Sequence, residues 1–247
     1  MSQSDLIGEY LRVVAAVKFH VEEQIELGFL ELPCEGGRFQ SVGTRLKSAR
    51  PGLYRDGELA PSVVYESMED IRIAVENCRA CSLHASRTNV VFGTGNEEAR
   101  LVFVGEAPGA DEDQQGQPFV GRAGQKLTQI IEAIGLSRSQ VYITNVLKCH
   151  PPGNRNPLPE EVQACEPYLI GQLRLIKPRV ICALGTFAAQ TLLRTNRRIS
   201  TLRGRFHTYQ GIKLMPTYHP AYILRNPMFK RDVWEDVKKV RAEYDRA

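Results

Sequence analysis

The chain has 247 residues and a formal net charge of +4, with 43% hydrophobic and 24% charged residues. These proportions are ordinary for a globular protein, and the length suits one medium domain with an appendage. No apolar run approaches the roughly 18 residues of a transmembrane helix, and the first residues do not resemble a signal peptide. We therefore expect a cytoplasmic protein without a membrane span. The positive charge permits nucleic-acid binding but does not argue strongly for it.

The N-terminal quarter differs in composition from the rest of the chain. Apolar residues fall at helical spacing over residues 4–28, which predicts an amphipathic helix. The stretch that follows is rich in Gly, Arg, Ser and Pro and predicts a linker or extended arm. Ser67, with Asp70 three positions later, matches a helix capping box. We therefore expect an N-terminal helix and arm over 1–66, with no assigned function, and a main domain over 67–247.

Apolar runs and helical patterns alternate through the main domain. Strands are predicted at 101–104, 141–147, 180–184 and 212–215. Helices are predicted at about 122–134, 159–176, 186–194 and 229–245. This alternation is typical of a parallel sheet covered on both faces. The predicted fold is α/β, a three-layer α/β/α arrangement with a central, mostly parallel four-stranded sheet, plus the N-terminal helical extension.

Unusual residues follow the predicted strands. The first strand ends in the turn GEAPG at 105–109, the second contains Asn145, the third ends at Gly185, and the last is followed by His219. Because open parallel sheets bind ligands outside the carboxyl ends of their strands, we expect these residues to line one pocket.

The six cysteines are expected to be reduced thiols, because no export signal is evident. Cys78 and Cys81 form a C-x2-C pair, and Cys149 and Cys165 lie 16 positions apart. Such a pair is uncommon outside metal or redox sites, although Cys149 and Cys165 could also be small core residues. Structural zinc modules usually use two close pairs, whereas a four-thiolate iron–sulfur cluster tolerates this spacing. Cys34, in the arm, and Cys182, in a strand, are left out of the ligand set.

Four segments carry a resemblance to a known family. GEAPGADED, QPFVGRAG, TNVLKCHPPGNR and YHPAYILR occur in this order, together with the C-x2-C pair and Cys165. Over about residues 67–240 this set resembles the family 4 uracil-DNA glycosylases. The resemblance implies an enzyme that flips deoxyuridine out of DNA and hydrolyses its N-glycosidic bond, leaving an abasic site for base excision repair. It also implies a [4Fe-4S] cluster held by Cys78, Cys81, Cys149 and Cys165.

The resemblance assigns roles around the base. Phe119 would stack on the flipped uracil, and Asn145 would pair with O4 and N3–H, because a carboxamide offers one donor and one acceptor. His219 would hydrogen-bond O2 and stabilise the leaving uracil anion. Glu106 would position or deprotonate the attacking water. Without the resemblance, these four residues could be a core ring, a strand-end cap, a structural histidine and a helix N-terminal carboxylate.

Further residues are expected to shape the pocket. Gly105, Ala107 and Gly109 would let the backbone approach the base closely, and their amides could donate to uracil. Glu112 matches the residue expected to crowd uracil C5 and reject the methyl group of thymine. The neighbouring Asp113, with Asp111, is expected to form only a solvated turn.

The basic stretch RTNRRISTLRGRF, at 194–206, is a candidate DNA contact. A basic run is often only a solvated face, but beside a base pocket we expect phosphate contacts from Arg197, Arg198 and Arg203. Leu224 and Arg225 are candidates to fill the gap left by the flipped base.

One departure bears on turnover. Arg197-Arg198-Ile199 resembles the arginine loop of uracil-trapping relatives, but Ser200 stands where their covalent histidine would be, and Ala107 replaces their glutamine. We therefore expect a monomeric glycosylase that acts on uracil-containing DNA and turns over. The alternative is a protein that binds or covalently traps uracil-DNA without turnover. An iron–sulfur redox protein is disfavoured, because nothing implies a second electron carrier.

Overall fold

The computed structural model describes residues 65–246, which belong to one compact unit. The expected helix over 4–28 and almost all of the arm lie outside these residues, so both remain predictions, as does the division of the chain at residue 66. Within the described range, no helix is long and apolar enough to cross a membrane.

A six-stranded sheet forms the centre of the fold, in the order β1-β3-β2-β4-β6-β5. Its four central strands are parallel: β3 (Tyr142–Asn145), β2 (Leu101–Gly105), β4 (Val180–Leu184) and β6 (Ile212–Thr217). They confirm the predicted parallel core. The short edge strands β1 (Thr94–Gly95) and β5 (His207–Tyr209) pair antiparallel and were not expected. At two and three residues, they are too short to show an alternating pattern.

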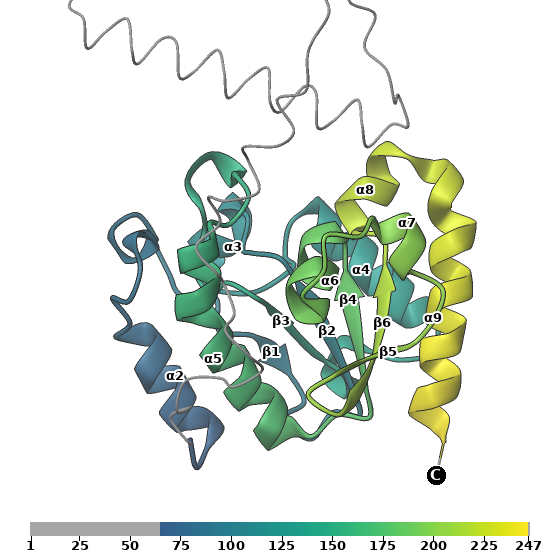
Figure 1. Ribbon diagram of the computed structural model, residues 1–247, viewed down its shortest axis with the longest axis horizontal. Helices are drawn as coiled ribbons and strands as arrows, with labels where there is room; N and C mark the ends of the chain where they lie inside the picture. Colours follow the sequence, from purple (N-terminus) through teal and green to yellow (C-terminus); the bar gives the residue numbers. More distant parts are fainter. Residues whose placement is uncertain (1–64, 247) are drawn as a thin grey trace, which may run out of the picture. The chain divides into compact units, whose positions relative to one another are not determined.

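Helices cover both faces of the sheet, which confirms the three-layer arrangement (Figure 1). One core cluster joins the sheet to α2 (Met68–Glu76), α5 (Pro159–Ile176), α6 (Thr186–Leu193) and α7 (Ile199–Leu202). The other joins it to α4 (Arg122–Ala133), α8 (Pro220–Arg225) and α9 (Lys230–Asp245). A further helix, α3 (Ala110–Gln115), lies between β2 and α4 in the chain.

The strand residues divide between the two core clusters by their alternation. In β2, Val102 and Val104 pack into the cluster with α5, whereas Leu101 and Phe103 pack into the cluster with α4 and α9. Successive side chains of a strand point to opposite faces, and a parallel sheet covered by helices buries both. This explains why the central strands read as continuous apolar runs.

Local signals set several helix boundaries. Ser67 Oγ accepts from the Asp70 N–H at 3.1 Å, and the Asp70 carboxylate accepts from the Ser67 N–H at 3.0 Å. The predicted capping box is therefore confirmed. α5 begins at Pro159, where proline's fixed φ and missing N–H suit a first turn, and Pro178 follows its end.

The carboxyl ends of β2, β3, β4 and β6 lie along one edge of the sheet because these strands are parallel. Figure 1 shows α3 and α8, which follow β2 and β6 in the chain, at that same end of the sheet. The residues that follow the strands are therefore gathered on one side of the domain, as the order of the elements predicts.

Candidate functional site

Gly105, Phe119 and Asn145 converge at the ends of β2 and β3. Gly105 is the register partner of Asn145 across the two strands. A methyl group at Gly105 would overlap Asn145 Oδ1 and lie 2.6 Å from Phe119 Cζ. Glycine is therefore required here for three elements to approach one another.

Asn145 carries an unpaired polar atom. The residue is 2% exposed, and within the described part of the chain its Oδ1 has no hydrogen-bond partner. Leaving a buried acceptor unpaired costs about 1–3 kcal/mol, so a native protein that keeps one usually uses it. This oxygen suits a ligand that donates a hydrogen bond to it.

Phe119 is held in an unusual backbone conformation. Its φ is +55°, in the left-handed region that a bulky residue rarely adopts. Arg138 supports this turn: Nη2 donates to the Pro118 carbonyl at 2.9 Å, and Nη1 donates to the Phe119 carbonyl at 3.3 Å. The Phe119 ring centroid lies 5.8 Å from that of His219, so the two rings lie beside each other. No sequence motif marks Arg138, because its partners lie in a loop 19 and 20 positions earlier in the chain.

His219 is fixed in one tautomer. It caps α8, and its Nδ1 accepts from the Ala221 N–H at 3.1 Å. Burial, helped by the positive charge of Arg225, lowers the pKa of His219 to about 4. The ring is therefore neutral at pH 7, with its proton on Nε2. At the end of β4, Gly185 has φ +93°, and a methyl group there would lie 2.9 Å from His219 Cβ, so this glycine gives the histidine room.

Glu106 follows β2 directly. Its carbonyl accepts from the Leu147 N–H at 3.0 Å, which joins it to the chain beyond β3. Burial raises the pKa of the Glu106 carboxyl to about 7. No residue between 65 and 246 donates a hydrogen bond to this carboxylate or pairs with it. A partly buried carboxylate that ionises near neutrality is a candidate general base.

Glu112 ties two loops together. One carboxylate oxygen accepts from the Gly109 N–H at 3.1 Å, and the other accepts from the N–H groups of Val120 and Gly121 at 3.0 and 3.1 Å. The turn after β2 is thereby joined to the loop that carries Phe119. The Gly109 amide, expected to face a base, is occupied by Glu112, while Ala107 packs against the core cluster of α5.

Asp113 and His150 make specific contacts that the sequence did not indicate. Asp113 is buried, and its carboxylate accepts from the N–H groups of Thr88 and Asn89, so the expectation of a solvated turn was wrong there. His150 Nδ1 lies 2.8 Å from the Pro108 carbonyl and supports the turn after β2. Both contacts join distant segments, which motif reading does not detect.

The four candidate cysteine ligands line one small pocket. Cys78, Cys81, Cys149 and Cys165 all contribute to its wall. Two donors point at sulfur: Arg87 Nη1 lies 3.2 Å from Cys149 Sγ, and the Lys148 N–H lies 3.2 Å from Cys165 Sγ. Over residues 65–246, no three Cys, His, Asp or Glu side chains converge as ligands of a single metal ion.

The remaining cysteines stand apart from this pocket. Cys182 is fully buried within β4 and does not line it. Cys34 falls outside the described residues, so its omission from the ligand set remains a prediction.

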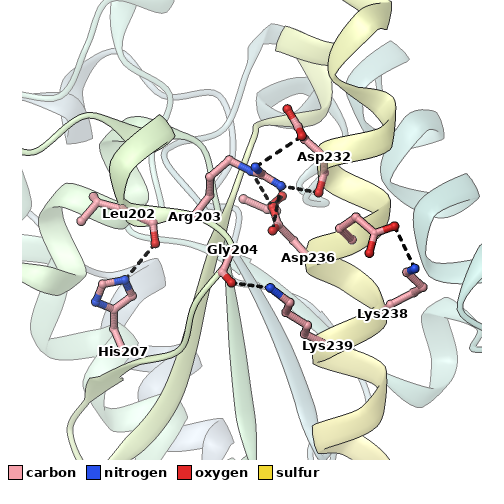
Figure 2. Close-up of polar contacts among 10 residues, drawn as sticks. Leu202, Arg203, Gly204, His207, Asp232, Asp236, Lys238 and Lys239 are labelled. Carbon is pink, nitrogen blue, oxygen red and sulfur yellow. Dashed lines mark hydrogen bonds and ion pairs between the residues drawn. The ribbon is translucent and has the colours of Figure 1, made fainter.

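The basic stretch divides into two parts. Arg197 and Arg198 are exposed at the start of α7. Arg203, by contrast, is directed at α9 (Figure 2): its Nε and Nη2 each lie 2.9 Å from the Asp236 carboxylate, and Nη1 lies 3.5 Å from that of Asp232. Its side chain is only 16% exposed. This corrects the expectation of a phosphate contact at Arg203, because its guanidinium already binds two carboxylates.

Exposed apolar residues mark the end of α8. Leu224 is 40% exposed, Arg225 beside it is exposed, and Met228, in the turn that follows α8, is 81% exposed. The rings of Tyr218, Tyr222 and Phe229 lie 4.9–5.3 Å apart and support this segment.

Comparisons with known proteins add an independent observation. A family profile described as "Uracil DNA glycosylase superfamily" matches residues 92–238. The type-4 uracil-DNA glycosylase of Archaeoglobus fulgidus is 48% identical over 183 residues, which cover 71% of this chain and 92% of that protein. Type-4 uracil-DNA glycosylases of Thermotoga maritima and Sulfurisphaera tokodaii are 46% and 44% identical. The alignment with the Thermotoga protein covers 72% of this chain and 94% of that protein. The alignment with the Sulfurisphaera protein covers 71% of this chain and 84% of that protein.

Proposed function

This chain belongs to the uracil-DNA glycosylase superfamily, as a type-4 member, and from that premise we propose that it excises uracil from DNA. The reaction is hydrolysis of the N-glycosidic bond, which leaves an abasic site for repair. The observation that carries the proposal is the unpaired, buried Oδ1 of Asn145, which lies near Phe119, whose ring lies beside that of His219.

Asn145 reads the edge of the flipped base in this proposal. Its Oδ1 accepts from uracil N3–H and its Nδ2 donates to O4, which gives the unpaired oxygen its partner. Cytosine presents an amine donor and a bare N3 acceptor at these positions, so both contacts would be mismatched. Phe119 stacks on the face of the base, and its constrained backbone fixes the ring before DNA arrives.

His219 stabilises the leaving group. Negative charge develops on uracil O2 as the glycosidic bond breaks, and the Nε2–H of a neutral imidazole donates to it. The Ala221 N–H at Nδ1 keeps the proton on Nε2, and the lowered pKa keeps the ring neutral in the working pH range. No proton needs to leave this side chain for the bond to break.

Glu106 acts on the water and the sugar. Above pH 7 its carboxylate is ionised and accepts a proton from the attacking water. Its negative charge also favours the oxocarbenium-like sugar of the transition state. Because the raised pKa comes from burial, the carboxylate is a stronger base than an exposed glutamate.

Glu112 has a different role from the one expected. We assign it to positioning the loop of Phe119 rather than to direct contact with uracil C5, because backbone amides bind both of its oxygens. Rejection of thymine then depends on how closely that loop approaches the base.

A [4Fe-4S] cluster is the cofactor that the cysteine pocket suits. Four thiols line one cavity, and two N–H donors point at their sulfurs, as is common around cluster ligands. Cys78, Cys81, Cys149 and Cys165 would hold it. When bound, the cluster supplies a covalent cross-link between three distant segments.

Arg197 and Arg198 are the proposed phosphate contacts, and Leu224 with Arg225 the residues that enter the gap in the duplex. We further propose that the protein acts as a monomer in the cytoplasm and that it turns over. Ser200 supports turnover, since it offers no imidazole to capture the sugar.

The test is an excision assay on matched oligonucleotides that carry uracil or thymine at one position. Released uracil and an alkali-labile site in the uracil strand alone would support the glycosylase. A protein–DNA band that survives boiling in detergent would favour the covalently trapping alternative. No base release from single- or double-stranded uracil DNA would overturn the proposed activity.

A further inference from the structure

Lys148 lies fully buried between the cysteine pocket and the base-reading residue. Its Nζ donates to Thr144 Oγ1 at 2.5 Å, to Gln172 Oε1 at 2.7 Å and to the Asn145 carbonyl at 2.9 Å. An ammonium group has three protons, so these three acceptors satisfy it completely. None of the three is a carboxylate, which leaves the positive charge without a direct counter-ion.

The other end of the same residue belongs to the cysteine pocket. The Lys148 N–H donates to Cys165 Sγ at 3.2 Å, the residue lines the pocket, and Cys149 follows it in the chain. A buried ammonium is costly unless negative charge lies nearby. The thiolates of an assembled cysteine site would supply that charge.

The contact with Asn145 acts at the end of β3. Asn145 is the last residue of β3, and its side chain must hold an unpaired oxygen toward the base. The network around the ammonium anchors this end, because Thr144 Oγ1 and Gln172 Nε2 both donate to the Phe92 carbonyl, at 3.1 and 3.0 Å. The Asn145 peptide is thus tied, through one lysine, to β3, α5 and the loop before β1.

We propose that Lys148 is a positioning residue that couples the cysteine pocket to base reading. Its ammonium fixes the Asn145 peptide, and the assembled cysteine site fixes Lys148. The inference rests on the proposed function. A lysine that served only the stability of the core would affect all forms of DNA binding alike.

The experiment compares two DNA ligands. Uracil DNA requires Asn145, whereas abasic-site DNA offers no base to read. Affinities are measured by fluorescence anisotropy in a Glu106→Gln background, so that the uracil stays in place. Lys148→Met keeps most of the length of the side chain but removes the N–H donors of the ammonium group. We expect it to weaken uracil-DNA binding roughly tenfold, the upper worth of one hydrogen bond, and to change abasic-DNA binding less than twofold.

Two further variants keep the test decisive. Tyr142→Phe is the control: the Tyr142 hydroxyl accepts from Gln172 Nε2 at 3.3 Å, so its loss weakens the same network without touching Lys148 or Asn145. We expect both affinities to be unchanged. Thr144→Val removes one acceptor of the ammonium while keeping the charge, and we expect a smaller, roughly threefold loss on uracil DNA alone. If Lys148→Met loses iron and its absorbance near 400 nm, Thr144→Val decides the question.

Equal weakening of both ligands, or no change in either, would overturn the role of Lys148. A Glu106→Gln protein that does not prefer uracil DNA to thymine DNA would instead count against the proposed function. The two failures are therefore distinguishable.

Discussion

Gly105 has no room for a side chain beside Asn145 and Phe119. An added methyl group would overlap Asn145 Oδ1 and press on the Phe119 ring. We expect Gly105→Ala to lower the single-turnover rate of uracil excision roughly 10- to 100-fold, because overpacking of about 1–3 kcal/mol would displace both base contacts.

The matched control is Gly211→Ala, in the β5–β6 hairpin. Gly211 has φ +78° and open space around it, so alanine there strains the backbone far from the pocket. We expect a lower melting temperature with normal excision. A normal rate for Gly105→Ala would mean that the pocket is wider than the structure indicates.

The ionisation of Glu106 should determine how the rate of uracil excision falls at acidic pH. Its pKa of about 7 lies well above that of an ordinary glutamate, while His219, near 4, remains neutral. The single-turnover rate should therefore rise about tenfold per pH unit below pH 7 and level off above it. Glu106→Gln should remove this dependence along with most of the activity. A wild-type rate that is flat from pH 5 to 8 would contradict the assignment.

The same pKa predicts a cost in stability. Because the folded-state pKa is raised by burial, the folded state binds the proton more tightly, and stability falls as pH rises from about 4.5 to 7. Glu106→Gln should therefore raise the free energy of unfolding at pH 8, by at most about 3 kcal/mol, and change it little at pH 4. Urea denaturation at the two pH values measures this difference. An equal change in the free energy of unfolding at pH 4 and pH 8 would show that ionisation of Glu106 does not lower the stability.

Asn145→Asp tests base reading directly. The change removes the amide donor to O4, and each polar group left unpaired costs about 1–3 kcal/mol, or roughly 10- to 150-fold in rate. We expect a large loss of uracil excision and weak new excision of cytosine, whose amine the carboxylate can accept. Release of each base is measured on matched oligonucleotides. Wild-type uracil excision by a folded, iron-containing variant would remove Asn145 from this role.

At the scale of secondary structure, Arg198 and Arg203 flank the same short helix, α7, but differ in their contacts, because only Arg203 is bound by α9. Arg203 binds Asp236, whose side chain is fully buried (Figure 2). Arg198, by contrast, is exposed at the start of α7. Arg203→Ala should lower the free energy of unfolding by about 3–5 kcal/mol, because it leaves a buried carboxylate unpaired. The salt dependence of DNA binding should not change.

Arg198→Ala should do the opposite. We expect normal stability and a salt dependence reduced by about one phosphate contact, with all DNA sequences weakened alike. Chemical denaturation and DNA titrations at several salt concentrations separate the two effects. A reduced salt slope for Arg203→Ala would restore that residue to the DNA-binding set.

The elements also show what a single sequence can specify. α5 matches its predicted range, 159–176, because eighteen residues carry a clear helical pattern bounded by prolines. α3, α7 and α8 have only four to six residues, too few to display a period of 3.6. Arg203 could not be separated from its neighbours because its partner lies 33 positions further along the chain.

At the scale of the whole molecule, topology explains why the edge of the sheet at which the candidate residues lie could be predicted, whereas the contacts that support them could not. Because their strands are parallel, Glu106, Asn145 and His219 lie at one edge of the sheet for any conformation of the loops. The order of the strands is therefore enough to predict this placement. The contacts of Arg138, Asp113 and Lys148 depend instead on how loops and buried side chains meet. Sequence spacing does not encode those distances.

The cysteine pocket extends this argument to the assembly of the domain. Its four thiols come from the segment after α2, the chain beyond β3 and the middle of α5. A cluster bound there closes long loops of the unfolded chain and fixes three segments at once. Stability should therefore depend on the metal as well as on the apolar core.

Cys149→Ala and Cys182→Ala form the decisive pair for the cofactor. Both thiols are buried, but only Cys149 lines the pocket, while Cys182 lies within β4. We expect about four irons per chain and absorbance near 400 nm in the wild type, and loss of both, with a lower melting temperature, in Cys149→Ala. Cys182→Ala should keep its iron and lose only the modest stability of a small core truncation. Stoichiometric zinc in wild-type protein made with ample iron, or equal iron in the two variants, would show that the pocket does not hold the cluster.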